Sequence, residues 1–525
     1  MKRNIQAYLV IAGSVFIFWM MLMNSCKPGP VKVYKKNRSH ADVKDDSIAA
    51  GEALAVKYCQ SCHMLPSPDL LDATTWDKGV LPQMAPRLGI FEYKYQRYPN
   101  NSMDPNVGRS FYPSAPLLSG QEWGNIIAYY TALAPDTLPP QQRADPIRAN
   151  ALLFQVELPA GGDSSPPATC FVKYEPSVHQ VFTSDINGHS FKRWNTRLEQ
   201  LSTREVSGAI VDMAGDSSDY ITCNIGAFAP NNAKSGHVDA FDISGHLPMA
   251  HSPLYNGLMR PVNIVNTDLN GDGKKDIVVC EFGFIKGELS WLENKGDTFE
   301  KHILRNLPGA IRVVVDDYNH DGLPDIWALF AQGDEGIFLY TNKGHGQFAE
   351  QRILSFPPSY GSSYFELDDF DHDGNPDILY TCGDNGDFST VLKPYHGVYI
   401  YMNGGRIQFT QKYFFPINGC YRAVARDFDG SGNLSIAAIS YFADYEHQPE
   451  EGFVYLQNKG KLQFKPYSVP GTETGRWITM DVSDFDGDGR PDILLGNCSV
   501  GPSFIKPGTD FKKGPPFVLL RNKGK

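Results

Sequence analysis

The sequence lacks an excess of positive charge. Its 48 Lys and Arg residues are outnumbered by 59 Asp and Glu residues, so the 525-residue chain has a formal net charge of −11. A protein that binds DNA or RNA needs a basic surface to contact the phosphates. The composition therefore excludes nucleic acid as a partner. The sequence also lacks a recognisable pairing of nucleophile and base, which argues against a hydrolase or a lyase.

Long apolar runs are also scarce. One prominent run, from Ala7 to Met23, follows two basic residues and is short for a membrane span, which needs about 20 apolar residues. A basic start, an apolar run and small residues are typical of a secretory signal. We interpret residues 1–26 as a signal peptide or lipoprotein anchor with Cys26 as the lipidated residue, and residues 27–46 as a polar linker. An uncleaved anchor helix is the alternative. Either interpretation predicts an exported, membrane-attached protein, in the periplasm or on the cell surface.

Cysteine is uncommon, but two of the 9 cysteines stand together in "KYCQSCHMLP" (57–66). The C-x-x-C-H pattern of Cys59, Cys62 and His63 is the attachment signature of a c-type haem. Covalent attachment of this haem takes place outside the cytoplasm in bacteria, which agrees with the predicted export. The alternatives are a chance match or a disulfide between the two cysteines.

Two amphipathic helices are predicted on either side of this pattern, at residues 47–58 and 119–134. Ser47 can cap the first helix, and Ser119 with Glu122 forms a capping box for the second. This arrangement resembles the cytochrome c fold, in which the terminal helices pack together beside the haem. The resemblance implies a small all-α cytochrome c domain at residues 47–139. It also implies thioether bonds to Cys59 and Cys62, and iron ligation by His63.

Met84 is the candidate for the sixth iron ligand, 21 residues after His63 and with prolines on both sides. A thioether ligand would raise the reduction potential relative to a second histidine. Met84 could instead fill a gap in the core. Met64 adjoins His63 and cannot reach the opposite side of the iron, and Met103 lies in a polar loop.

The rest of the chain contains a repeat. An aspartate-rich segment recurs with its first aspartates 49 to 58 residues apart, and a turn in which Asn precedes Lys-Gly or Gly-Gly recurs in step with it. Two turn signals per unit predict four short strands, and four-stranded units arranged in a ring form a β-propeller. The aspartate-rich segments begin at Asp268, Asp317, Asp369, Asp427 and Asp484, with a decayed copy at Asp212.

We predict seven blades in residues 151–525, with residues 169–195 as a first blade that has an ordinary turn instead of an acidic loop. The last blade ends at Lys525, directly after its final turn, and lacks an outer strand. The segment "ALLFQVEL" (151–158) is predicted to supply that strand and to close the ring, which removes an exposed edge. Residues 140–150 would then form a short linker. It would place the helical domain near the seam between blades 1 and 7.

The acidic loops have oxygen atoms at positions 1, 3, 5 and 9 and glycine at position 6, like the start of an EF-hand loop. Such hard ligands suit Ca²⁺, although a single loop of this kind could be only an Asx-rich turn. The loop that begins at Asp427 has Ser431 and Ser435 in place of two carboxylates, so weak binding or none is predicted there. Four calcium sites are predicted, with the ligands Asp268, Asn270, Asp272, Asp276; Asp317, Asn319, Asp321, Asp325; Asp369, Asp371, Asp373, Asp377; and Asp484, Asp486, Asp488, Asp492.

By these loops, residues 206–525 resemble FG-GAP (VCBS) repeat proteins, the propeller family that includes the integrin α head. The whole chain resembles a bacterial FG-GAP protein with an N-terminal cytochrome c domain. The resemblance implies a multidomain fold, in which the small all-α domain is followed by an all-β seven-bladed propeller. Calcium ions in such loops are mostly structural.

The longest inserts join the second strand of a blade to the third and should lie on one face of the propeller, often the binding side of a repeat protein. They are rich in Tyr, Phe, His, Lys and Asp, as a carbohydrate- or protein-binding surface would be. Arg204, Arg260 and Arg476 each stand eight residues before the first aspartate of a loop. They are predicted at the start of innermost strands on that face, where they could converge on a carboxylate or phosphate. The alternative is three solvated arginines paired with nearby acids.

These features predict a membrane-anchored c-type haem electron-transfer protein whose calcium-stabilised propeller binds a redox partner protein, a carbohydrate or an anionic ligand. The alternative is a cytochrome-fused dehydrogenase that oxidises a sugar or alcohol and reduces its own haem. The tryptophan docking motifs of quinoprotein propellers are missing from the sequence, which argues against that alternative. A purely adhesive protein is a third and weaker interpretation.

Overall fold

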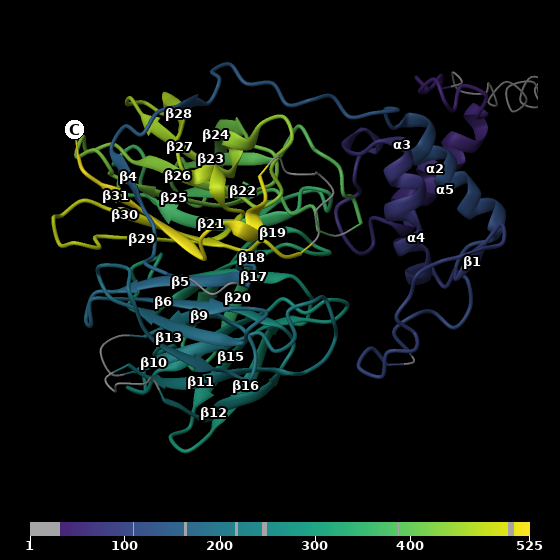
Figure 1. Ribbon diagram of the computed structural model, residues 1–525. Helices are drawn as coiled ribbons and strands as arrows, with labels where there is room; N and C mark the ends of the chain where they lie inside the picture. The colour runs from purple at the N-terminus through teal and green to yellow at the C-terminus, as the bar shows by residue number, and fades with distance from the viewer. Residues whose placement is uncertain are drawn as a thin grey trace, which may run out of the picture.

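The chain folds into a helical domain and a β-propeller that lie side by side (Figure 1). The computed structural model describes residues 32–108, 110–161, 165–215, 219–243, 249–386, 388–501 and 509–524. The predicted signal segment and Cys26 lie outside these residues. Among the residues described, no helix is long and apolar enough to cross a membrane.

The helical domain is built around two helices of 14 residues, α2 (Asp45–Tyr58) and α5 (Gly120–Leu133), which pack against each other. At their crossing a Cβ on Gly51 would lie 1.9 Å from the backbone oxygen of Asn125, so only glycine permits this approach. The shorter elements are η1 (Pro68–Leu70), α3 (Ala73–Thr75), the π-turn η2 (Trp76–Val80), α4 (Leu81–Met84), η3 (Ala85–Leu88), β1 (Glu92–Tyr93) and β2 (Gln96–Arg97).

The predicted capping box of α5 is confirmed, since the Ser119 hydroxyl accepts from the Glu122 amide and the Glu122 carboxylate accepts from the Ser119 amide. The first helix begins two residues before the predicted start at Ser47, with Lys44 as its N-cap. Residues 32–44, expected to belong to a free linker, lie along the domain instead. Tyr34 is buried in its core, and Asn37 donates to backbone oxygens at the end of α5.

The propeller has the seven predicted blades, each a sheet of at least four antiparallel strands. Blades 1 to 4 consist of β5 (Thr169–Glu175), β6 (Gln180–Asp185), β7 (Ser190–Trp194), β8 (Gln200–Glu205); β9 (Ile210–Ala214), β10 (Tyr220–Asn224), β11 (Gly236–Asp242), β12 (Met249–Leu258); β13 (Pro261–Thr267), β14 (Asp276–Glu281), β15 (Glu288–Asn294), β16 (Phe299–Arg305); and β17 (Ala310–Asp316), β18 (Asp325–Phe330), β19 (Gly336–Asn342), β20 (Phe348–Ser355). Blades 5 to 7 consist of β21 (Ser362–Asp368), β22 (Asp377–Cys382), β23 (Gly397–Asn403), β24 (Phe409–Pro416); β25 (Cys420–Arg426), β26 (Ser435–Ser440), β27 (Phe453–Asn458), β28 (Phe464–Ser468); and β29 (Trp477–Ser483), β30 (Asp492–Asn497), β31 (Phe517–Asn522), β4 (Phe154–Glu157).

Burial within a blade follows the composition of its strands. The second strands of blades 2 to 7, such as β18 with the sequence DIWALF, are buried at every residue because a neighbouring blade covers each face. The outermost strands, such as β20, are polar and largely exposed or half-buried. Seven apolar clusters join neighbouring blades around the ring. The core of the propeller is therefore a ring of interfaces between blades.

The ring closes as predicted. Strand β4 pairs antiparallel with β31, with Val156 opposite Leu520 and Phe154 opposite Asn522. Phe154 is 3% exposed and packs edge-to-face on Phe428 and Tyr455 of blade 6. Because β4 precedes blade 1 in the chain, this pairing joins the two ends of the propeller.

The segment between the domains is held along the propeller. Gln141 donates to the backbone oxygens of Lys393 and His396 on blade 5, and Arg143 pairs with the buried Glu451 of blade 6. Strand β3 (Arg148–Ala149) then adds a fifth strand, parallel to β28, to blade 6. The chain thus crosses blades 5 and 6 before it reaches blade 7.

The position predicted for the helical domain, near the seam of blades 1 and 7, was wrong. Among the described residues its contacts are with blades 2, 3 and 5. The Tyr395 hydroxyl donates to Leu70 O at 3.0 Å, and Asn232 donates to Asp104 at 2.8 Å. A Cβ on Gly79 would lie 2.3 Å from Phe388 O, so the two backbones meet closely there. The ordered path along blades 5 and 6 explains the difference, because it separates the domain from β4.

The ring closure predicts the effect of shortening one side chain of β4. Phe154→Ala is expected to lower the free energy of unfolding of the propeller by about 3–5 kcal/mol, because it leaves a cavity between blades 6 and 7. Urea denaturation followed by tryptophan fluorescence measures this. Gln155→Ala, on the same strand but exposed, is the matched control and should change the value by less than about 0.5 kcal/mol. Equal effects of the two substitutions would contradict the proposed role of β4.

Candidate haem and calcium sites

The C-x-x-C-H segment directly follows α2. Cys59 is the C-cap of that helix, and its amide donates to Ala55 O at 2.8 Å. Both cysteines are free thiols, with Cys59 half-buried and Cys62 exposed. Burial, with a smaller effect of Cys62, raises the pKa of the Cys59 thiol to about 11. The pair is therefore not in a disulfide, and both sulfur atoms remain open to covalent attachment.

The hydrogen bond of His63 sets its tautomer. Its Nδ1 lies 2.8 Å from the backbone oxygen of Met64. A carbonyl oxygen only accepts, so Nδ1 carries a proton, and Nε2 is the ring nitrogen left for a metal. A carbonyl that accepts from one ring nitrogen commonly orients a histidine that binds a metal through the other nitrogen. The half-buried ring thus fits an iron ligand.

Met84 ends α4 and is half-buried, with Leu81 and Ala85 beside it in the core of the helical domain. Met103 is 93% exposed. Of the methionines considered from the sequence, Met84 alone combines partial burial with a position on a packed element of this domain. The donor types of Cys59, Cys62 and His63 are those of a c-type haem, and Met84 stays a prediction as the sixth ligand.

The acidic loops share one hydrogen-bond pattern. In blade 3, Asp268 accepts from the amides of Gly271 and Gly273, and Asp272 accepts from the amide of Lys274, at 2.8–2.9 Å. Asp276, at position 9, is fully buried and accepts from the Leu269 and Asn294 amides. The same pattern recurs for Asp369 and Asp377, and for Asp484 and Asp492. In blade 4, Asp317 accepts from Gly322, but Asp325 accepts only from the Asn342 amide, and its Oδ2 has no partner among the described residues.

The two repeat signals contact each other, which sequence reasoning missed. The asparagine of each Asn-Lys-Gly or Asn-Gly-Gly turn donates its backbone N–H to the side chain at position 9 of the acidic loop in the same blade. Asn342 and Asn522 also donate through Nδ2 to the backbone oxygens of Leu269 and Phe428 in the preceding blades. The recurrence of both signals once in each unit was the available clue, since residues that repeat in step are often neighbours.

Two of the predicted calcium loops bring three carboxylates together. Oxygens of Asp369, Asp371 and Asp377 lie within 4.8 Å of one another, as do those of Asp484, Asp486 and Asp488. Asp486 also pairs with Arg521 at 2.8 Å. In the loops of blades 3 and 4 an asparagine replaces one carboxylate. Oxygen ligands at this density fit a hard cation such as Ca²⁺.

Burial raises the pKa of Asp377 to about 6, and likewise that of Asp492. Both values lie above the ordinary aspartate pKa. Without a cation, the ionisation of these two carboxyl groups therefore lowers the free energy of unfolding as the pH rises from about 4 through about 6. A bound divalent cation would offset that cost.

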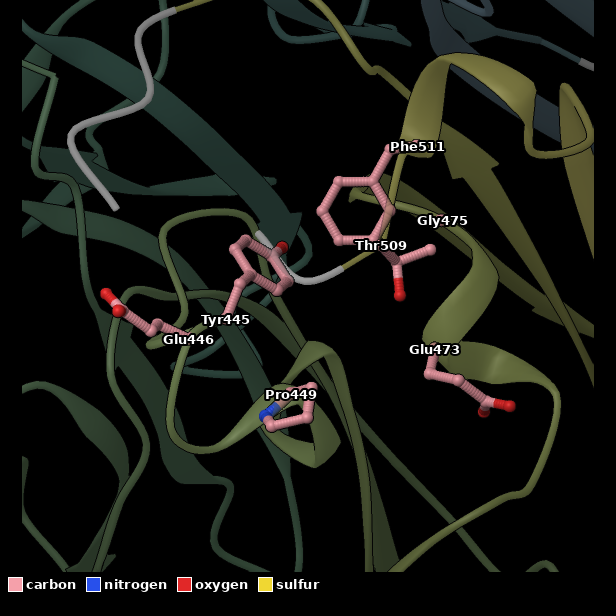
Figure 2. A pocket seen from close by; sticks show the side chains of 7 residues that line it. All are labelled: Tyr445, Glu446, Pro449, Glu473, Gly475, Thr509 and Phe511. Atoms are coloured by element: carbon pink, nitrogen blue, oxygen red, sulfur yellow. The ribbon is translucent and has the colours of Figure 1, made fainter. Parts of the chain in front are cut away.

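The inserts occur where the sequence predicted, between the second and third strands of blades 2, 5, 6 and 7. We call the side of the propeller that carries them the insert face. Between the inserts of blades 6 and 7 lies a pocket of about 140 Å³ (Figure 2). Tyr445 and Phe511 pack edge-to-face at 4.9 Å, with Thr509 beside them, while the carboxylates of Glu446 and Glu473 point in opposite directions. The pocket is smaller than those that enclose drug-sized ligands, which start at about 300 Å³, so it suits a side chain or a single sugar ring.

The three predicted arginines have different positions. Arg204 lies in β8, the outermost strand of blade 1, so its predicted place on an innermost strand was wrong. Arg260 and Arg476 do precede the innermost strands β13 and β29 and are buried. Arg260 donates to the backbone oxygens of Phe228 and Gly283, and Arg476 to that of Tyr441, whose ring it also covers at 3.7 Å. These two side chains hold the connections of the insert face.

Comparison with known families agrees with the repeat. The profile of the FG-GAP-like repeat matches residues 268–328 and 317–380. These residues therefore carry FG-GAP-like repeats, which occupy blades 3 and 4 and the start of blade 5.

Curated relatives are distant. Cartilage acidic protein 1 of Xenopus tropicalis is 28% identical over 203 residues, which are 35% of this chain and 28% of that protein. The T-cell immunomodulatory protein homolog of Plasmodium falciparum is 22% identical over 344 residues, 54% of this chain and 46% of that protein. The chain thus spans less than half the length of each. Both come from eukaryotes and give no support to a bacterial origin.

Among solved structures, the crystal structure of BBS1N in complex with ARL6DN is 10% identical, with a TM-score of 0.42 over 72% of this chain and 99% of that chain. The Dos1 propeller is 8% identical, with a TM-score of 0.39 over 68% and 78% of the two chains.

The acidic loops predict a calcium-dependent melting temperature. Excess calcium should raise the melting midpoint of the full-length protein above its value in EGTA, increasingly with free calcium, because the ion binds only the folded form. The gain should be larger at about pH 7.5 than at about pH 5, where protons compete for Asp377 and Asp492. Scanning calorimetry measures both.

Position 3 of the loops supplies a matched pair of variants. Asp371→Ala should reduce the calcium gain, whereas Asp429→Ala, in the serine-containing loop of blade 6, should leave it unchanged. A midpoint indifferent to both chelator and calcium would rule out the calcium interpretation.

Proposed function

We propose that this chain is an exported c-type haem electron-transfer protein, attached to the membrane through its N-terminal segment, whose propeller holds the haem domain and docks a partner. The observation that carries the proposal is the hydrogen bond from His63 Nδ1 to Met64 O beside two free cysteines. Bound haem would supply one-electron chemistry between ferric and ferrous iron. Cys59 and Cys62 would hold the haem, and His63 and Met84 would ligate the iron.

The protein's own residues would position this site in two ways. The contact of α2 and α5 fixes Cys59 at the end of a packed helix. The His63–Met64 bond orients the imidazole without help from the propeller. The helical domain would therefore bind haem as a unit, while Asn232, Tyr395 and Gly79 fix where that unit sits on the insert face.

The propeller would contribute binding rather than chemistry. The pocket of Tyr445 and Phe511 combines aromatic surface, the Thr509 hydroxyl and nearby carboxylates. Such a mixture suits a sugar ring or a side chain of a docked redox partner. The acidic loops lie at the opposite ends of the strands from the inserts. Calcium in these loops would stabilise the strands that lead to the insert face.

The first test removes the attachment points. Cys59→Ala combined with Cys62→Ala should abolish the haem stain that survives on a denaturing gel, because no thioether can form. The control is Cys223→Ala, a buried cysteine of blade 2, which should keep the stain. A stain retained in the double variant would refute the proposal.

A second test concerns the sixth ligand. Met84→Ala should remove the weak near-infrared absorption band of a thioether–iron bond and lower the reduction potential measured by spectroelectrochemistry. Met103→Ala, in an exposed loop, should change neither. An unchanged spectrum in the Met84 variant would assign the ligand to another group. Reduction of the haem by a sugar or alcohol alone would instead favour the dehydrogenase.

A further inference from the structure

Three innermost strands present side chains at the same register position. Arg312 of β17, Tyr364 of β21 and Arg422 of β25 each follow an irregular pair at the start of the strand. Blades 4, 5 and 6 are consecutive and are built alike. These three side chains therefore lie at one level of the ring, near its centre.

The two guanidinium groups share one aromatic ring. Arg312 lies 5.0 Å and Arg422 lies 4.6 Å from the centroid of Tyr364, which is 7% exposed. The two cationic groups consequently lie at most about 10 Å apart, on the same tyrosine ring.

Both arginines leave hydrogen-bonding capacity unused. The Nε atoms of Arg312 and Arg422 have no solvent contact and no hydrogen-bond partner, and neither side chain has a carboxylate within 4.0 Å among the described residues. Three other arginines that cover aromatic rings do have carboxylate partners: Arg305 and Arg352 pair with Asp334, and Arg521 pairs with Glu157.

The nearest acids are engaged elsewhere. Glu366 accepts from Arg426 and from the Ala425 amide. Asp212 accepts from Asn263 and from the Ile264 amide. Burial opposes the charge of Arg312, but Tyr364, Asp212 and Glu366 outweigh it and raise the pKa of this group. Arg312 thus remains a cation without a direct counterion.

We propose that the centre of the propeller binds a small oxyanion, a carboxylate or a phosphate, between Arg312 and Arg422. Neither guanidinium group has a carboxylate in direct contact, and an anion that accepts from both would supply these hydrogen bonds. The planar fork of each guanidinium matches two oxygens of such a group. Tyr364 holds the forks in place. The site does not depend on the haem.

Titration calorimetry of the full-length protein tests the site with sodium phosphate and, separately, sodium succinate at constant ionic strength, with sodium chloride as reference. Saturable binding of at least one of the two oxyanions, with a melting midpoint that rises with its concentration, is expected. Binding of phosphate alone or of succinate alone identifies the class of ligand. No saturable binding of either would overturn the proposal.

Variants locate the site. Arg312→Gln and Arg422→Gln should each weaken binding by roughly tenfold or more, since a charged hydrogen bond is lost. Arg312→Lys keeps the charge but not the fork and should also bind more weakly than the unchanged protein. Arg352→Gln is the matched control. It removes an arginine of the outer strand β20 that covers the ring of Phe338, and this variant should bind the anion normally.

A structural readout serves where a variant fails to fold. In crystals of the unchanged protein soaked with selenate, an anomalous peak within hydrogen-bonding distance of both Arg312 and Arg422 is expected. A peak only at other positions, or binding unaltered in both folded glutamine variants, would place the anion elsewhere and overturn the assignment.

Discussion

The pairing of β4 with β31 is the constraint on which the rest of the molecule depends. Arg521 of β31 forms a two-bond ion pair with Glu157 of β4 and also contacts Asp486, so the closing strand is bound to the acidic loop of blade 7. Once residues 154–157 are fixed there, the preceding chain must travel from the helical domain to blade 7. It does so by pairing β3 with blade 6 and bonding Gln141 to blade 5. The position of the helical domain over blades 2, 3 and 5 follows from that path.

The sequence predicted the blades and the capping box because each depends on local patterns, and it predicted the ring closure because the last blade lacks one strand and an unpaired strand precedes the first blade. A buried second strand such as β18 is apolar throughout, and each acidic loop repeats the same short hydrogen bonds. Periodicity reveals features that recur with the same local bonds. It does not reveal that Asn342 reaches Leu269 of the neighbouring blade, because that bond depends on the twist between two sheets.

The wrong position of Arg204 has a physical cause. Counting eight residues back from the first aspartate assumes that this aspartate follows the innermost strand, as Asp268 follows β13. In blade 2 the loop has decayed, and Asp212 lies within β9 itself and accepts from Asn263 of blade 3. The same residue count therefore reaches back into blade 1. Arg312 and Arg422 escaped notice for a related reason, since only the folded ring brings two residues 110 positions apart onto one tyrosine.

The way the helical domain is held bears on which of the two electron-transfer functions the protein can perform. Its described contacts with the propeller use Leu70, Gly79 and Asp104, none of them in the C-x-x-C-H segment, and Cys62 stays exposed. A partner can thus approach the proposed haem from solvent. A dehydrogenase that reduces its own haem needs its substrate pocket next to that haem. Here the pocket of Tyr445 and Phe511 belongs to blades 6 and 7, whereas the helical domain contacts blades 2, 3 and 5. In the proposed carrier the propeller positions the electron-transfer domain, and the electrons pass between the haem and a docked partner.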